Sequence, residues 1–162
     1  MDMPGVSSAC FKQNRDRVVT NYGVNIANGF KMADKKIVRT KTGFRVARIN
    51  RRRACRLMCK ECVGWESENQ IWECTGKFLD GETCHLHPFR DMEGNQNTKD
   101  RAKAIRSACL YCMGEQISLV VKCVSTFCPL HPYRIAKKDS TYLYSTELSD
   151  EEVLQIGLPK QT

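Results

Sequence analysis

The chain has 162 residues, of which 41% are hydrophobic, and its net charge at neutral pH is +8. This length predicts one domain or two small units that share a core, and the apolar content gives neither unit a large core of its own. Since no stretch approaches about 18 consecutive apolar residues, no membrane-spanning helix is expected.

Charge is distributed unevenly along the chain. Between Lys31 and Lys60 twelve residues are Lys or Arg, and Asp34 is the one acidic residue. The segment after Lys138 has the opposite character, with five acidic residues and one basic residue, Lys160. Because a dense basic region repels itself unless a partner neutralises it, this pattern favours a polyanion, above all nucleic acid, as the partner.

The first predicted unit is an arm over residues 1–47. Its segment KIVRTKTGFRVARI has β-branched residues on both sides of KTG, which predicts a basic β-hairpin turning near Gly43. A strand that runs directly into the following helix fits the same residues. That helix is expected from about Arg48 to Gly64, with basic residues four apart along one stripe: Arg48, Arg52, Arg56 and Lys60.

The second half of the chain is expected to begin with a polar linker over residues 91–100. Asp100 is placed to cap a helix that would end at Gly114. The last segment, residues 135–162, is an acidic tail in which SDEEVLQIG has the capping-box pattern of a short helix.

A cysteine phrase occurs twice, as CKECVG…C…CHLHPFR in residues 48–90 and as CLYCMG…C…CPLHPYR in residues 101–134. Alignment of the copies pairs Gly64 with Gly114 and each cysteine of one phrase with a cysteine of the other. The cysteine pairs are Cys59 with Cys109, Cys62 with Cys112, Cys74 with Cys123, and Cys84 with Cys128. Two accidental matches of this length are not expected, so these segments form an internal repeat.

The repeated cysteines have the spacing of structural zinc sites. Two thiolates of a CxxC segment reach one ion from a single turn of backbone, and a second pair completes a tetrahedron. The first 30 residues contain no apolar leader, which predicts a reducing compartment, where spaced thiols are metal ligands more often than disulfides. Two Zn²⁺ ions are therefore expected, one held by Cys59, Cys62, Cys74 and Cys84, the other by Cys109, Cys112, Cys123 and Cys128. Disulfides, a redox CxxC pair and an iron–sulfur cluster are the alternatives.

Two histidines offer a second ligand set. His87 and His131 each lie three residues after a predicted ligand, so they are alternative metal ligands in place of Cys74 and Cys123. The competing interpretation is that each histidine packs or forms hydrogen bonds beside the site.

Two cysteines fall outside both ligand sets. Cys55 aligns with Ile105 on the inward face of the helix, which predicts a buried core thiol. Cys10 lies in the N-terminal arm and has no evident partner.

The second copy, AIRSACLYCMG…VVKC…CPLHPYR, resembles a zinc-finger-like segment found in small bacteriophage and prophage proteins. The positions that fill its pattern are Cys109, Cys112, Gly114, Cys123, Cys128, Pro129, Leu130, Pro132, Tyr133 and Arg134. The resemblance implies a metal-binding fold, a phage origin, the cytoplasm of the infected bacterial host, and no required ligand role for His131. The first copy departs from the pattern, because His85 replaces the proline and its loop before Cys84 is longer.

These observations predict a small α+β zinc-stabilised fold with two tandem four-cysteine modules, short helices and little regular sheet. The favoured function is binding of nucleic acid, with duplex DNA preferred, by occupancy or recruitment in transcription or replication. The residues expected to contact phosphates are Lys35, Lys36, Arg39, Lys41, Arg45, Arg48, Arg51, Arg52, Arg53 and Arg56.

Two other functions remain open. One is a protein-interaction factor that modulates a host enzyme or defence system, with the acidic tail as a docking helix or as a plain cap on the domain. The other is a zinc-stabilised nuclease, for which His85 or His87 with Asp80 or Asp91 are the candidate residues. An enzyme is the less favoured interpretation.

Overall fold

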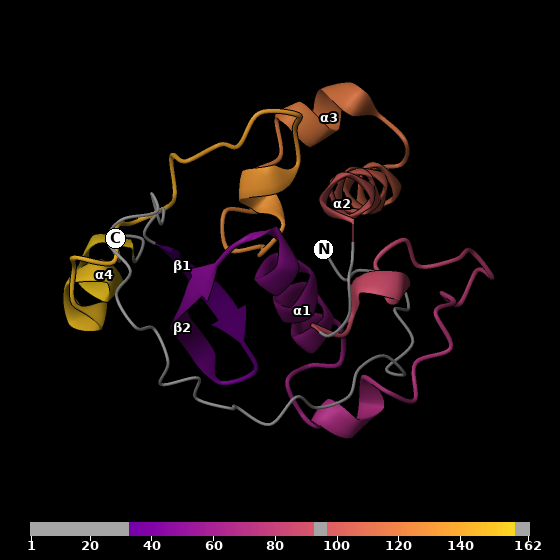
Figure 1. Ribbon diagram of the computed structural model, residues 1–162, viewed down its shortest axis with the longest axis horizontal. Coiled ribbons are helices and arrows are strands. Elements are labelled where there is room, and N and C mark those ends of the chain that lie inside the picture. The colour runs from indigo at the N-terminus through magenta and orange to yellow at the C-terminus, as the bar shows by residue number, and fades with distance from the viewer. Residues whose placement is uncertain (1–32, 93–96, 158–162) are drawn as a thin grey trace.

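The computed structural model describes residues 33–92 and 97–157, and these form a small α+β fold with a two-stranded hairpin and four α-helices (Figure 1). The order is β1 (Asp34–Thr40), β2 (Gly43–Ile49), α1 (Arg51–Cys62), α2 (Thr98–Cys112), α3 (Ile117–Val121) and α4 (Asp150–Gly157). Short 3₁₀ turns occur at η2 (Glu68–Gln70), η3 (His87–Phe89) and η4 (His131–Tyr133). Regular sheet is scarce, as expected, and none of the described helices has the length and hydropathy needed to cross a bilayer.

The predicted hairpin is confirmed. β1 and β2 pair antiparallel, with Lys35 opposite Arg48 and Thr40 opposite Gly43, so the chain turns through the two residues between Thr40 and Gly43. Gly43 has a φ of 144°, a conformation that side chains disfavour. The strand therefore turns back on itself before the helix begins, and the alternative of a strand that continues directly into the helix is wrong.

The hairpin is covered on both sides. Val38, Ala47 and Ile49 lie on one face and join the core that contains α1. α4 lies on the opposite side of the hairpin from α1 (Figure 1), and its Val153 is fully buried. The capping box predicted for this helix is present, since Ser149 N donates to Glu152 and Glu152 N donates to Ser149 Oγ. The acidic tail thus closes the outer face of the hairpin.

Side-chain caps set the beginnings of the two long helices. The Asn50 side chain accepts a hydrogen bond from Arg53 N at 2.9 Å, so α1 begins at Arg51 and Arg48 belongs to β2. The prediction that Arg48 begins the helical stripe of basic residues is therefore wrong. α2 begins at Thr98 because Asn97 is its cap, so the prediction that Asp100 caps this helix is wrong. Residues 93–96 of the predicted linker lie outside the described residues.

The two copies of the cysteine phrase end their helices in the same way. Val63 N donates to Cys59 O at 3.2 Å, and Met113 N donates to Cys109 O at 3.1 Å. Each helix is followed by two residues with positive φ: Gly64 (65°), Trp65 (61°), Gly114 (60°) and Glu115 (63°). The glycines predicted as helix ends therefore occupy the left-handed conformation that glycine tolerates best.

The last part of each phrase also repeats. His87 N donates to Cys84 O and His131 N donates to Cys128 O, both at 3.1 Å. The imidazole Nε2 of each histidine lies 3.0 Å from the carbonyl oxygen of the preceding loop cysteine, Cys74 or Cys123. The repeat in the sequence is thus a repeat in the structure at the helix ends and at the histidines, whereas the loops between the cysteines differ.

The two modules pack against each other reciprocally. The Arg51 guanidinium of α1 lies 5.6 Å from the ring centre of Tyr133 in the second module. The aligned residue of α2, Arg101, lies 5.8 Å from the ring centre of Phe89 in the first module. Cys55 is fully buried in the core between them, as predicted, whereas Cys10 lies outside the described residues. Each module therefore completes the core of the other.

We expect Gly76→Ala to destabilise the fold by about 2–4 kcal/mol, because it adds steric overlap to the cost of a left-handed alanine. Gly76 has a φ of 71°, and a Cβ there would lie 2.6 Å from His87 Cγ, inside the first cysteine loop. Urea unfolding gives the free energy of unfolding for comparison.

Gly81→Ala is the matched control, because Gly81 has a φ of 87° in the same loop but nothing within 4 Å of a Cβ. We expect it to cost about 1 kcal/mol, from the backbone alone. Equal losses in the two variants would show that the His87 ring is not fixed against the loop.

Candidate functional site

The four predicted ligands of the second module lie around one point of the fold. Cys109 and Cys112 occupy the last turn of α2, Cys123 follows α3, and Cys128 precedes η4. Burial first, and then the neighbouring thiols Cys112 and Cys123, raise the pKa of Cys109 to about 12. The pKa of Cys128 is raised to about 12 by burial, then by Glu61, and then by Cys109 and Cys123. Cys109 and Cys128 therefore lie close enough to neighbouring thiols for those thiols to disfavour their ionisation.

The first module brings three of its four predicted ligands together. Burial raises the pKa of Cys59 well above its usual value, and the neighbouring Cys84 and Cys62 raise it further. The pKa of Cys62 is raised to about 11 by burial and then by Cys84. Cys74 is buried, accepts a hydrogen bond from Gly76 N at 3.1 Å, and is disulfide-bonded. In this structure its sulfur is therefore not free to be the predicted fourth zinc ligand.

Proximity does not amount to a coordination sphere in this structure. Within residues 33–92 and 97–157, no three His, Cys, Asp or Glu side chains are arranged to hold a metal ion. The thiols would have to converge further to bind one. Because a thiol with a raised pKa is protonated at neutral pH and is a poor nucleophile, the same surroundings give no support to redox or nucleophilic chemistry at these cysteines.

The two histidines predicted as alternative ligands have both ring nitrogens engaged. Since a carbonyl oxygen can only accept, Nε2 of His87 and of His131 carries the proton in its contact with the loop cysteine. Nδ1 of each ring faces the guanidinium of Arg90 or Arg134 at 3.4 Å, and a guanidinium can only donate. In this arrangement neither ring offers a lone pair to a metal, and each histidine instead fastens its cysteine loop.

The arginine that ends each phrase is a site residue that the sequence analysis left unassigned. Arg134 is 8% exposed and donates from Nη1 to His131 O at 2.7 Å and to Asp139 at 2.8 Å. Hydrogen bonds from Thr141, followed by that from Arg134, lower the pKa of Asp139. The repetition of Arg after HPF and HPY was the signal for this role. An arginine that donates to the carbonyl oxygen of the histidine, half-buried as Arg90 and buried as Arg134, is thus part of each module.

Three of the predicted phosphate-binding residues are not on the surface. Lys35 is 8%, Lys36 1% and Arg56 5% exposed. Lys35 donates to Leu148 O and to Asp150, and Arg56 donates to Arg90 O and to Glu68, each from inside the fold. The expectation that these three side chains form part of a basic surface is wrong, because Lys35 holds the tail, Arg56 holds the first module, and Lys36 reaches the loop of the second module.

The other seven form what we call the basic surface, which consists of Arg39, Lys41, Arg45, Arg48, Arg51, Arg52 and Arg53. Five of them are exposed, and Arg51 and Arg52 are half-buried. The Arg45 guanidinium lies over the ring of Trp65 at 5.3 Å, and Lys41 is paired with Glu66. Trp65 was not predicted as a site residue. The basic surface therefore follows both strands and the turn of the hairpin and the first turn of α1, with the Trp65 ring beside Arg45.

The residues considered for a nuclease are not assembled into a catalytic group. Asp80 accepts a hydrogen bond from Tyr111 Oη at 2.6 Å, and His85 is exposed. In the described part of the chain, neither His85 nor His87 joins Asp80 and Asp91 in a metal-binding cluster. The structure therefore offers no support for this function.

Comparison of the chain with protein-family models, with curated proteins and with solved structures finds no match.

Proposed function

We propose that this chain is a phage protein in which two structural zinc ions stabilise a scaffold for nucleic-acid binding. The observation that supports it best is the repeated cysteine loop, with the same hydrogen bonds and the same helix ending in both modules. The resemblance of the second cysteine phrase to phage zinc-finger-like segments supports a phage origin for the chain. Binding would act by occupancy or recruitment in transcription or replication.

The chemistry of the thiols supports zinc. Burial raises the pKa of Cys109, Cys112 and Cys128, so these thiols lose their protons most readily when a cation replaces them, and thiolate is a ligand that Zn²⁺ prefers. In the second module Cys109, Cys112, Cys123 and Cys128 are all free. The ions would have a structural role, since they would tie the end of each helix to its loop.

The basic surface supports nucleic acid as the partner. Between Lys35 and Arg56 the chain has no acidic residue, and its exposed and half-buried basic side chains lie on the hairpin and on the start of α1. Closely spaced guanidinium groups on a rigid hairpin and helix can each meet a phosphate. Phosphate contact does not depend on base sequence, and duplex DNA is the form of nucleic acid that we propose.

The alternative function is a protein-interaction factor, and one observation favours it. Ile117, Leu119 and Val121 of α3 are between 42% and 58% exposed, and Val124 is 86% exposed. In the alignment that pairs Cys74 with Cys123, Ile117 and Leu119 correspond to Glu68 and Gln70 of the first module, which are polar. The fold therefore does not require apolar residues there.

The zinc proposal predicts one ion per module in protein purified under reducing conditions. We expect Cys112→Ser to lose the ion of the second module and Cys62→Ser to lose that of the first, as measured by elemental analysis and by cobalt substitution. Cys55→Ala is the control, because Cys55 is buried in the core outside both sets and should leave metal content unchanged. Loss of metal in the control alone, or metal-free wild-type protein, would contradict the proposal.

The nucleic-acid proposal predicts that replacing Arg45, Arg48 and Arg53 together by alanine weakens binding to labelled duplex DNA. The slope of log affinity against log salt should become shallower by about 0.9 for each phosphate that the variant no longer binds. Fluorescence anisotropy at several salt concentrations measures both quantities.

The matched control replaces Lys99, Lys103 and Lys122, which are also exposed but lie outside the basic surface. This variant has the same change in net charge, and we expect it to retain most of the affinity and slope. Equal weakening in both variants would mean that only net charge matters. The absence of binding by wild-type protein to duplex DNA, single-stranded DNA and RNA would overturn the proposal in favour of protein interaction.

A further inference from the structure

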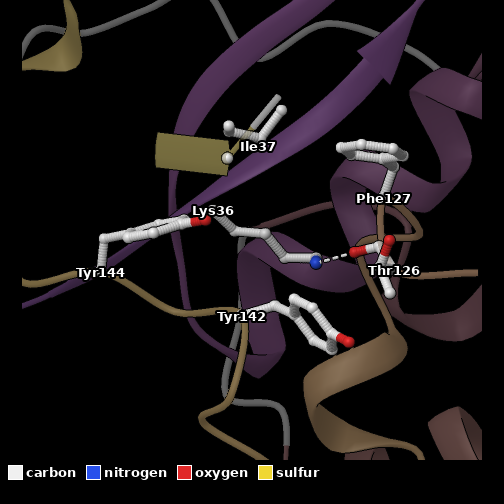
Figure 2. Close-up of a pocket in the computed structure, with 7 residues that line it drawn as sticks. Lys36, Ile37, Thr126, Phe127, Tyr142 and Tyr144 are labelled. Atoms are coloured by element: carbon white, nitrogen blue, oxygen red, sulfur yellow. Dashed lines mark hydrogen bonds between the residues drawn. The ribbon is translucent and has the colours of Figure 1, made fainter. Parts of the chain in front are cut away.

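Lys36 is a buried ammonium group between the hairpin and the second cysteine module. It is 1% exposed, and its side chain extends from β1 to donate a hydrogen bond to Thr126 O (Figure 2). The Tyr142 ring lies beside it, with its centre 5.9 Å from Nζ. Thr126 belongs to the short loop between Cys123 and Cys128. The lysine therefore reaches directly into the loop that carries two of the predicted ligands.

The surroundings of Lys36 do not match its charge. Lys35, the neighbouring residue, donates to the carboxylate of Asp150 at 2.7 Å. For Lys36 the described chain provides a neutral carbonyl and an aromatic ring as direct partners. The nearby carboxylate of Asp139 is bound by Arg134 at 2.8 Å. A buried ammonium group is unfavourable unless an anion neutralises it, and neither of these direct partners carries a negative charge.

The thiols of the second module could provide a negative charge that neutralises the Lys36 ammonium group. Cys128 lies within the electrostatic field of Lys36, and Glu61 from α1 lies within that of Cys128. Four thiolates carry two more negative charges than one divalent cation neutralises. A metal-loaded second module would therefore be an anion facing a buried cation.

We propose that Lys36 is the charge partner of the metal site in the second module, where its ammonium group stabilises the metal-bound tetrathiolate. This inference rests on the proposed zinc function and adds a residue from outside both cysteine phrases. It also makes the hairpin part of the metal site. Because β1 pairs with β2, metal binding in the second module would help to fix the strand that carries Arg45 and Arg48.

The first module provides an internal comparison. Its buried cation, Arg56, is ion-paired with Glu68, with Nη2 3.1 Å from Oε2, and so is already neutralised. Loss of the Lys36 charge should therefore weaken one of the two metal sites and leave the other unchanged.

The test uses Lys36→Met, which keeps the length of the side chain and removes its charge. Reduced full-length protein is loaded with zinc, and the affinity of each site is measured by competition with a chromogenic chelator. We expect the affinity of one site to fall about 10- to 100-fold, as for other groups that support metal ligands. Urea unfolding of the metal-free variant should give equal or greater stability, because replacing a buried charge by an apolar group relieves its desolvation.

Two controls separate charge from packing and from general damage. Lys36→Gln retains a donor for Thr126 O but no charge, and it should lose as much metal affinity as Lys36→Met. Lys35→Met breaks the pair with Asp150 and should leave both metal affinities unchanged. The inference about Lys36 would be overturned, without affecting the zinc proposal, if Lys36→Met had unchanged metal affinity or if Lys36→Gln had the metal affinity of the wild-type protein. Absence of metal in the wild-type protein would overturn the zinc proposal with it.

Discussion

The structure depends on the contact between the last turn of each long helix and the loop that follows it. In both modules a CxxC segment ends the helix, the chain turns through two left-handed residues, and a histidine returns to bind the loop cysteine's carbonyl oxygen. These loops contain almost no regular structure. They can support a core only because each is fastened at several points, and a metal ion would supply the strongest of these.

The doubling of the module follows from the small size of each core. One module buries too few apolar side chains to be stable alone. Arg51 and Arg101 each cover an aromatic ring of the opposite module, and the interface between their helices is made by small residues such as Ala54 and Ala104. Each module thus contributes an arginine to an aromatic ring of the other module. The same pair of contacts is made in both directions, as at the interface of a symmetric dimer.

Net charge overstates the charge available to a partner. Lys35, Lys36 and Arg56 lie in the basic region of the sequence, yet they are buried and hold the tail, the second cysteine loop and the first module. The basic side chains that are left for contact with nucleic acid are those of the basic surface, on the hairpin and the start of α1. Its position on rigid elements, and not its total charge, is the argument for binding.

Much of the fold could be predicted because its signals are local. Gly43 placed the hairpin turn, Gly64 and Gly114 placed the helix ends, and the Ser149 capping box placed α4. The roles of Lys36 and Arg56 could not be predicted, because a strand or helix pattern gives the spacing of side chains but not the elements that cover them. Likewise the engagement of His87 depends on a loop that approaches from 13 residues away in sequence. The spacing of the cysteines predicted the proximity of the other predicted ligands but not the disulfide bond of Cys74, and it left open what the thiols bind.

The central claim is that the cysteines hold zinc through sulfur alone. Zinc K-edge X-ray absorption of the full-length protein, purified under reducing conditions, tests it most directly. The account predicts four sulfur neighbours per zinc at about 2.3 Å. Nitrogen neighbours at about 2.0 Å would show that His87 or His131 turns from its carbonyl to bind the metal, and a sample without zinc would contradict the account altogether.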